Sequence, residues 1–210
     1  MSKKLSIALT VYLISLFAAN TLGLKTMPFL WGTHLSVAVF WFPIVFLMTD
    51  IVGEVYGKKT ARMFVHAGVI SIALFLLYSL IAQLMPWSQH SMWAQPAYSK
   101  IFSLSMRFSI ASLVAYAIGE YQDIFAFFKV KATIGSKYFW LRSNLSNLWS
   151  QLFDTGVFLL IAFWGVYSLK AIVLMAIPWY LYKVIMGALY TPLSYVGLKL
   201  LKPSPSDSLL

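Results

Sequence analysis

The stretch Met63–Leu84, MFVHAGVISIALFLLYSLIAQL, decides the fold class, because it contains no Asp, Glu, Lys or Arg. A helix of about 20 apolar residues is long enough to cross the hydrocarbon core of a bilayer. Five further stretches of similar character flank it, separated by short segments with Pro, Gly or Lys. The sequence therefore predicts an all-α integral membrane protein, a bundle of six transmembrane helices at Leu5–Leu22, His34–Val52, Met63–Leu84, Ser105–Phe128, Leu145–Val166 and Ala171–Leu198.

The composition supports a membrane protein and excludes several enzyme classes. Hydrophobic residues make up 60% of the chain and charged residues 10%, against about 45–50% and about 25% in soluble domains. There is no cysteine, which excludes disulfides, thiolate–zinc sites and thiol nucleophiles. The chain contains no HExxH, GxSxG or P-loop motif, and no pair of its three histidines has metal-ligand spacing. We therefore expect no enzymatic activity, no bound metal and no cofactor.

The distribution of basic residues predicts the orientation in the membrane. Three lie in the segments predicted to face outward, Lys25, Lys100 and Lys170, and eleven lie at the ends and in the other loops: Lys3, Lys4, Lys58, Lys59, Arg62, Lys129, Lys131, Lys137, Arg142, Lys199 and Lys202. Because Lys and Arg gather on the cytoplasmic side, both termini are expected in the cytoplasm. The net charge of +10 therefore needs no nucleic-acid partner.

The two ends of the chain differ in composition: the N-terminus is basic and then apolar, and the C-terminus is rich in Pro and Ser. Lys3 and Lys4 before an apolar run resemble a secretory signal peptide, but the run is long and five spans follow, so we expect a retained first helix. Residues 1–202 are predicted to form one six-helix transmembrane domain. The segment 203–210, which is rich in Pro and Ser, is predicted to be a short disordered cytoplasmic tail.

Seven charged side chains fall inside the predicted spans or, for Glu54, at the cytoplasmic rim of one: Asp50, Glu54, Arg107, Glu120, Asp123, Asp154 and Lys183. Each charge costs about 2.5–3.5 kcal/mol at the centre of a lipid-exposed helix. These residues are therefore expected to face one another or a wet cavity, as in a carrier or channel. Asp154 and Lys183 both fall near mid-span and are expected to be able to pair.

Helical spacing indicates which of these groups share a face. Asp50 and Glu54 are four residues apart; Glu120 and Asp123, and likewise Gln151 and Asp154, are three apart. Small residues near the last two pairs, including Gly119 and Ser150, would let their helices approach closely. Two purely structural interpretations stay open: an Asp154–Lys183 clasp, and neutralisation by Asp50 and Glu54 of the cations that follow them, Lys58, Lys59 and Arg62.

The stretch Phe42–Gly57, FPIVFLMTDIVGEVYG, resembles the queuosine precursor transporter family, also called the vitamin uptake transporter family. Further matches are Asn20, the segment from Arg107 through Gly119-Glu120 to Asp123, the segment Ser150-Gln151-Leu152-Phe153-Asp154-Thr155, and Lys183. The resemblance covers roughly Asn20 to Tyr195. Glu120 departs from the family pattern, which has Gln at this position. The family is similar to the six-helix substrate-binding components of energy-coupling-factor vitamin importers.

This resemblance implies import of 7-deazaguanines such as preQ0 or preQ1 across the cytoplasmic (inner) membrane, for queuosine in tRNA. Such a ring presents adjacent N–H donors and a carbonyl on one edge, which carboxylates, amides and cations can bind. Trp41 or Phe42 is a candidate to stack on it. The candidate substrate-binding residues are Asn20, Asp50, Glu54, Arg107, Glu120, Asp123, Gln151, Asp154 and Lys183.

Two other functions remain open at this point: import of another small flat nutrient, such as a vitamin or purine, and a non-transporting structural role. The preferred precursor and the energy source also stay open. Without an ATP-binding motif, ATP-driven transport would require a separate energising subunit, and a homodimer remains an alternative assembly.

Overall fold

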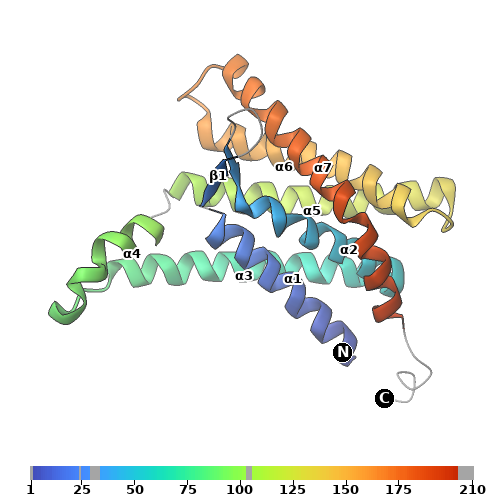
Figure 1. Ribbon diagram of the computed structural model, residues 1–210, viewed down its shortest axis with the longest axis horizontal. Helices are drawn as coiled ribbons and strands as arrows, with labels where there is room; N and C mark the ends of the chain where they lie inside the picture. Colours follow the sequence, from blue (N-terminus) through green and yellow to red (C-terminus); the bar gives the residue numbers. More distant parts are fainter. Residues whose placement is uncertain (1, 24, 29–33, 103–105, 203–210) are drawn as a thin grey trace.

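The computed structural model describes residues 2–23, 25–28, 34–102 and 106–202 (Figure 1). These residues are predominantly helical, and most of the helices are long. In chain order, the elements are α1 (Lys3–Leu22), β1 (Thr26–Pro28), β2 (His34–Ser36), the 3₁₀ helix η2 (Val37–Phe40), α2 (Phe42–Tyr56), α3 (Lys58–Leu84), the 3₁₀ helix η3 (Gln89–Ala94), α4 (Gln95–Phe102), α5 (Met106–Ile134), α6 (Phe139–Phe163) and α7 (Leu169–Leu201).

Local sequence explains where several helices begin and end. Ser2 caps α1 by accepting a hydrogen bond from the Leu5 N–H at 3.3 Å, and Ser168 caps α7 by accepting one from the Ala171 N–H, also at 3.3 Å. Gly57, with φ of 86°, separates α2 from α3 in a backbone conformation that glycine adopts readily. These signals agree with the predicted breaks between spans.

Among the described residues, three helices are long and apolar enough to cross a membrane: α1, α3 and α7. They match the predicted spans Leu5–Leu22, Met63–Leu84 and Ala171–Leu198 to within a few residues at each end. α5 and α6 are also long, with 29 and 25 residues, and contain the predicted spans Ser105–Phe128 and Leu145–Val166 apart from the undescribed Ser105 and the segment after Phe163. Their acidic residues set them apart from the other three.

The predicted span His34–Val52 is wrong at its start. His34–Ser36 pairs with Thr26–Pro28 as an antiparallel two-stranded hairpin, and a turn of 3₁₀ helix follows. The α-helix begins only at Phe42, with Pro43 in its first turn, where proline is tolerated because its missing N–H would have no partner. With 15 residues, α2 is about 22 Å long, which is shorter than the hydrocarbon core.

Two predicted loops are also corrected. The segment Lys129–Arg142 is mostly helical, because α5 continues to Ile134 and α6 begins at Phe139. Between α3 and α5, the structure adds η3 and the short helix α4, so that seven α-helices are present in the described part of the chain. The predicted tail, 203–210, lies outside the described residues.

Successive long helices run back and forth, so that both ends of the described chain lie at the same end of the molecule (Figure 1). There, the Lys4 ammonium donates a hydrogen bond to the Lys202 carbonyl at 2.8 Å. The Tyr56 hydroxyl, at the end of α2, donates to the Leu201 carbonyl at 3.0 Å. Most of the basic residues that the sequence assigns to one side of the membrane gather at this end.

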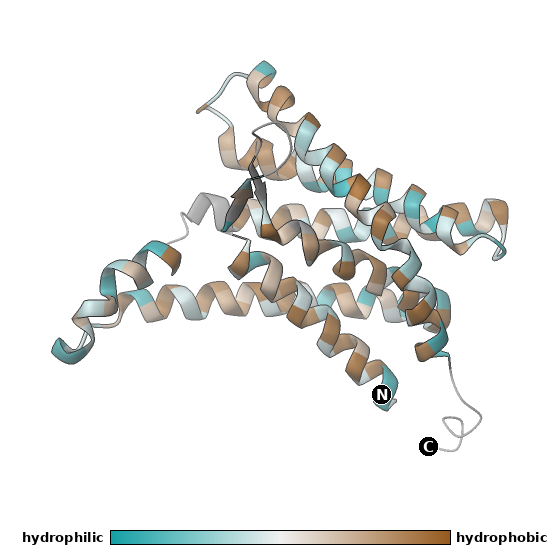
Figure 2. Ribbon diagram, in the orientation of Figure 1, coloured by the Kyte–Doolittle hydropathy of each residue, from teal (hydrophilic) through white to brown (hydrophobic). Residues whose placement is uncertain are grey.

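The molecule is apolar outside and partly polar inside. Large apolar side chains are exposed along α3 and α7, among them Leu77 and Leu193, and Figure 2 shows hydrophobic residues along both helices. Acidic side chains such as Asp123, by contrast, are buried. A soluble protein has the opposite arrangement, so the chain is a membrane protein.

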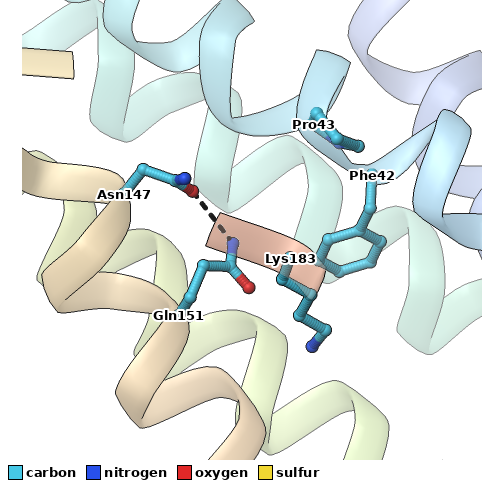
Figure 3. A pocket seen from close by; sticks show the side chains of 5 residues that line it. All are labelled: Phe42, Pro43, Asn147, Gln151 and Lys183. Carbon is cyan, nitrogen blue, oxygen red and sulfur yellow. Dashed lines mark hydrogen bonds between the residues drawn. The ribbon is translucent and has the colours of Figure 1, made fainter. Parts of the chain in front are cut away.

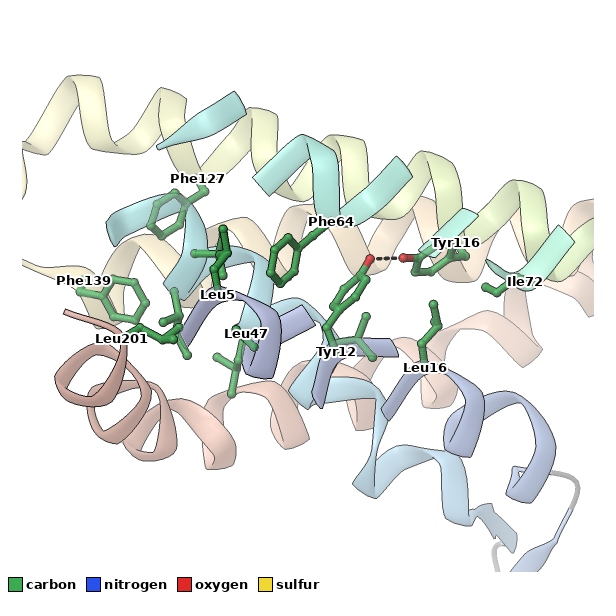
Figure 4. Packing of buried hydrophobic residues seen from close by; sticks show 14 residues of the cluster. Leu5, Tyr12, Leu16, Leu47, Phe64, Ile72, Tyr116, Phe127, Phe139 and Leu201 are labelled. Carbon is green, nitrogen blue, oxygen red and sulfur yellow. Dashed lines mark hydrogen bonds between the residues drawn. The ribbon is translucent and has the colours of Figure 1, made fainter. Parts of the chain in front are cut away.

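The apolar core lies between α1, α2, α3 and α5, with contributions from the ends of α6 and α7 (Figure 4). Tyr12 of α1 and Tyr116 of α5 are buried in it, and their hydroxyl groups are hydrogen-bonded to each other. This core holds one face of α5. Glu120 and Asp123 follow Tyr116 at spacings of four and seven residues, so the polar residues described next border this core where α5 packs against α6.

Candidate functional site

α5 and α6 form the most extensive helix pair in the structure, and small residues allow their close approach. A Cβ atom placed on Gly119 would lie 3.0 Å from the Cβ of Asp154. On α6, Ser143, Ser146 and Ser150 are all buried. The expectation of a small-residue contact between these two helices is therefore confirmed.

Two of the predicted acids are buried against these serines. The Ser143 hydroxyl donates a short hydrogen bond to Asp50 of α2, and the Ser150 hydroxyl donates to Asp123 at 3.0 Å. Asp50 and Asp123 are also close enough to interact electrostatically. The structure thus brings α2, α5 and α6 together around two carboxyl groups held by hydroxyls.

Glu120, the departure from the family pattern, lies one turn before Asp123. It is fully buried, and neither of its carboxyl oxygens has a hydrogen-bond partner among the described residues. Its nearest polar neighbours include Thr49 of α2 and Asp123. Glu120 therefore adds a third acidic group to the same interior region.

A small cavity lies beside this region, between α2, α6 and α7. Its volume is about 10 Å³, roughly the space that one water molecule needs. Figure 3 shows the five residues that line it: Phe42, Pro43, Asn147, Gln151 and Lys183. An aromatic ring, two amides and a cation therefore surround one space.

The polar groups of this cavity are partly paired. Lys183 forms an ion pair with Asp154, as expected, and its ammonium lies 5.4 Å from the centroid of the Phe42 ring. Gln151 donates a hydrogen bond to the Asn147 side-chain oxygen at 3.3 Å. The Asn147 Nδ2 and Gln151 Oε1 atoms remain without partners within the described part of the chain. One donor and one acceptor are thus available beside the ring of Phe42.

A second cavity of about 10 Å³ continues along α2. It shares Pro43 and Asn147 with the first, and its wall includes Asp50, Ser143 and Gly187. The paired acids and the amide–lysine cavity are therefore neighbours, connected by α2 on one side and by Asn147 on the other.

Buried polar atoms without partners concentrate around these cavities. Among the described residues, they occur on Glu120, Asp123, Asn147, Gln151 and Thr155, and also on Arg142. Since the great majority of buried polar atoms in proteins are hydrogen-bonded, each exception calls for an explanation such as a water molecule or a ligand. Their grouping on adjacent faces of α5 and α6 marks this interior as the candidate binding site.

Glu54 belongs to a different cluster, at the end of the molecule where the termini lie. Its carboxylate pairs with Lys131 at 2.7 Å and with Arg142 at 2.8 Å. The interpretation that Glu54 neutralises Lys58, Lys59 and Arg62 is therefore wrong, because α5 and α6 supply its partners. Arg142, expected in a loop, is a fully buried residue of α6, and its guanidinium lies over the rings of Phe127 and Phe139.

The remaining candidates lie away from the cavities or outside the described side chains. Asn20 donates to the Leu16 carbonyl at 2.9 Å and accepts from Ser112 at 3.2 Å, which joins α1 to α5. Trp41 is 39% exposed, so that of the two aromatic candidates Phe42 alone lines the cavity. Arg107 lies in the first turn of α5, and its side chain falls outside the described part.

Site residues missed from the sequence include Asn147, Ser143, Thr155 and Pro43. Ser143 and Asn147 had a detectable signal, because Ser143, Asn147 and Gln151 follow one another at intervals of four residues and share a helix face. Thr155 and Pro43 carry no charge, and their signal was their place in the two stretches that resemble the family. Within the described residues, no group of three or more His, Cys, Asp or Glu is placed to hold a metal ion.

The chain matches a known family model over most of its length. The model, described as "Putative vitamin uptake transporter", matches residues 36–197. This range begins in the hairpin and includes all of α2 to α6 and most of α7, and therefore every residue that lines the two cavities.

Three curated proteins are similar to the chain. The "Probable queuosine precursor transporter" of Bacillus subtilis is 29% identical over 190 residues, which cover 90% of this chain and 81% of that protein. The "Queuosine precursor transporter" of Escherichia coli is 30% identical over 133 residues, covering 63% of this chain and 57% of that protein. A "Probable queuosine precursor transporter" of Haemophilus influenzae is 29% identical over 156 residues, covering 74% and 60%.

The chain thus spans most of the Bacillus protein and little more than half of the other two. No solved structure matches the chain significantly. The family match spans the whole candidate site and agrees with the resemblance seen in Phe42–Gly57. The chain therefore belongs to the vitamin uptake transporter family.

Proposed function

We propose that this protein imports queuosine precursors, 7-deazaguanines such as preQ0 or preQ1, across the inner membrane for queuosine modification of tRNA. The names of three similar proteins support this substrate class. The family match and the polar interior of an otherwise apolar helical bundle support a transport function.

The single observation that carries the proposal is the pair of unpartnered amide atoms, Asn147 Nδ2 and Gln151 Oε1, beside Phe42 and Lys183. In our proposal, the flat ring stacks on Phe42. The Gln151 oxygen accepts from the ring's N–H groups, while the Asn147 amide and the Lys183 ammonium donate to its carbonyl. Asp154, which pairs with Lys183, holds the ammonium in position or binds the remaining N–H donor.

Substrate binding requires α2 to move. A cavity of about 10 Å³ is far smaller than a bicyclic ring, so the helices around it must separate to admit one. α2 has 15 residues and contributes Phe42 and Pro43 to the cavity wall. Movement of this short helix against α6 and α7 would open the site, and movement in the opposite sense would close it again.

In the proposed topology the chain crosses the membrane six times, with both termini in the cytoplasm. α1, α3, α5, α6 and α7 would each cross once, and α2 with the preceding hairpin and η2 would complete the remaining crossing. Charge supports this orientation, because the end that holds Lys4, Lys131 and Lys202 carries most of the basic residues. Residues 1–202 would then form the transmembrane domain, and 203–210 a cytoplasmic tail.

Two rival functions make different predictions about ligand binding. An importer of another flat nutrient would prefer a purine or a vitamin to the deazaguanines. A structural membrane protein would bind none of them. An ATP-driven mechanism would in addition require an energising subunit that copurifies with the chain, and a homodimer would appear as a doubled mass in detergent.

A calorimetric binding panel with the purified protein tests the proposal. We expect 7-deazaguanines to bind at least about tenfold more tightly than guanine, riboflavin or biotin, a difference of about 1.4 kcal/mol. Gln151→Ala should weaken binding by about tenfold or more through loss of a buried hydrogen bond. Asn144→Ala is a matched control, because Asn144 lies on the same helix but bonds to Thr191 and Trp140 instead of lining the cavity. Equal affinity for all ligands, or none, would exclude the proposed function.

A further inference from the structure

Three buried carboxyl groups meet where α2, α5 and α6 pack together, and none of them pairs with a cation among the described residues. Asp50 is 3% exposed, and Glu120 and Asp123 are 0% exposed. Asp50 and Asp123 are close enough to interact electrostatically, their carboxyl groups are held by Ser143 and Ser150 of the same helix, and Glu120 lies one helical turn from Asp123 on the same face of α5.

The nearby cations have other partners. Lys183 pairs with Asp154, and Arg142 pairs with Glu54. Arg107 is on the same helix as Asp123 but sixteen residues earlier in the sequence, which corresponds to about 24 Å along the axis. Hydroxyl groups are what hold the acids: Ser143 donates to Asp50, and Ser150 donates to Asp123.

Such a cluster cannot be fully ionised in a dry interior. Like charges on neighbouring buried carboxyl groups favour binding of a proton by one of them, and a buried charge without a partner carries a desolvation cost of several kcal/mol. Glu120 points to the same conclusion independently, because it is completely buried and both of its oxygens lack a partner.

The carboxyl pair is also connected to the cavity proposed for the substrate. Asp50 lines the second cavity, which shares Pro43 and Asn147 with the first. Pro43 and Asp50 are both on α2. A ring that enters beside Phe42 would displace α2, and the same displacement would separate Asp50 from Ser143 and Asp123.

We propose that Asp50 and Asp123 form the binding site of a proton that moves together with the substrate, so that the proton gradient drives import. This proposal rests on the proposed function. When the site faces outward, a hydronium ion from the external water gives its proton to the carboxyl pair, so that its O–H bond breaks, one O–H bond forms on the pair and a water molecule stays outside. The same bond breaks when α2 has moved and cytoplasmic water accepts the proton, so one proton enters per cycle and no other reactant is needed.

The surroundings of the pair contain both acids and phenols, and these groups must be included in any analysis of pH dependence. The titratable and charged side chains that face the cluster are Tyr12 from α1, Tyr116 and Glu120 from α5, Asp154 from α6 and Lys183 from α7. His66 of α3 is exposed and contacts Tyr121 instead.

Purified protein in sodium-free liposomes tests this proposal, with radiolabelled preQ1 as the substrate and a pH-sensitive dye in the lumen. We expect added preQ1 to acidify the lumen and to accumulate there when the outside is more acidic. A gradient of one pH unit supports up to about tenfold accumulation of a substrate that moves with one proton. A protonophore should reduce the accumulation ratio to the value without a gradient.

Two variants separate proton coupling from substrate movement. Asp123→Asn and Asp50→Asn should each abolish gradient-driven accumulation, but exchange of labelled for unlabelled preQ1 across the vesicle wall should continue, because exchange needs no net movement of protons. Asp207→Asn makes the same chemical change C-terminal to α7 and should accumulate preQ1 as the wild-type protein does. Size-exclusion profiles and melting temperatures would show that each variant is folded.

The outcomes distinguish this proposal from the proposed function. Exchange by wild-type protein, together with accumulation that ignores the pH gradient or follows a sodium gradient, would overturn proton coupling and leave the substrate assignment intact. Undiminished gradient-driven accumulation by folded Asp123→Asn and Asp50→Asn would overturn the proton site. Absence of both binding and exchange in the wild-type protein would overturn the proposed function, and proton coupling with it.

Discussion

Lys183 on α7 and Asp154 on α6 form an ion pair beside the ring of Phe42, with the ammonium 5.4 Å from the ring centroid. The pair joins the two helices at the edge of the amide-lined cavity. It therefore contributes both to the stability of the bundle and to the charge that a substrate would meet.

Substitution of either partner should be more harmful than substitution of both. Lys183→Met leaves the Asp154 carboxylate buried without a partner and should lower the free energy of unfolding by about 3 kcal/mol. The double variant Asp154→Asn/Lys183→Met should recover most of that loss, because neither charge remains. Uptake per folded molecule should stay low in both variants. Recovery of both stability and uptake in the double variant would show that the pair has only a structural function.

Two glycines at helix contacts should respond differently to substitution by alanine. A Cβ at Gly119 would lie 3.0 Å from the Asp154 Cβ, a side-chain atom next to the backbone, whereas a Cβ at Gly187 would meet the end of the Asn147 side chain. Gly119→Ala should therefore lower stability by about 1–3 kcal/mol. Gly187→Ala should cost much less stability but displace the Asn147 amide and weaken substrate affinity. Thermal unfolding would compare the stability of the two variants, and calorimetry would compare their affinity for the substrate. An equal loss of affinity in Gly119→Ala and Gly187→Ala would contradict this contrast.

The hydrogen bond between Tyr12 and Tyr116 offers a test of the apolar core. Both hydroxyls are buried, next to Gly68. Tyr12→Phe should lower the free energy of unfolding by about 1–3 kcal/mol, because the Tyr116 hydroxyl loses its partner. The double variant Tyr12→Phe/Tyr116→Phe should be closer to wild type, since no unpaired hydroxyl remains. Additive losses in denaturation experiments would contradict this account of the pair.

Much of the helical architecture was predictable from the sequence, because lipid-facing helices need long apolar runs whatever their packing. The start of α2 was not predictable in this way. The part of the span before Phe42, HLSVAVFW, is mostly apolar, and composition alone does not distinguish a hairpin and a 3₁₀ turn from the continuation of an α-helix. The position of Pro43 was the available signal for the helix start.

The candidate site was partly predictable for a related reason. Charged residues such as Asp50, Asp154 and Lys183 stand out in an apolar sequence, so their burial and the Asp154–Lys183 pair could be expected. Ion pairs between helices that are far apart in the sequence could not be expected, because they depend on how the helices pack. Glu54 therefore pairs with Lys131 and Arg142 of α5 and α6, and not with the cations that follow it in the sequence.

The cluster around Glu54 depends on the geometry of an arginine. Arg142 donates from Nη1 to the Gly135 carbonyl at 2.6 Å while Nη2 lies 2.8 Å from Glu54. A lysine has one ammonium in place of this planar fork. Arg142→Lys should therefore keep the charge but lower the melting temperature, with a loss of about 1–3 kcal/mol. Lys131→Arg is the matched exchange at a partly exposed site and should change stability little. Equal melting temperatures for wild type and Arg142→Lys would contradict the role of the fork.

The most direct test of the central claim is queuosine in tRNA, measured by mass spectrometry in bacteria that can neither make the precursor nor import it. Cells that express this chain should contain queuosine in their tRNA when they receive preQ0 or preQ1 at a concentration at which cells without the chain have queuosine-free tRNA. Cells that express the Lys183→Met variant at the same level should contain much less. Queuosine-free tRNA in cells with correctly inserted wild-type protein would contradict the proposed function.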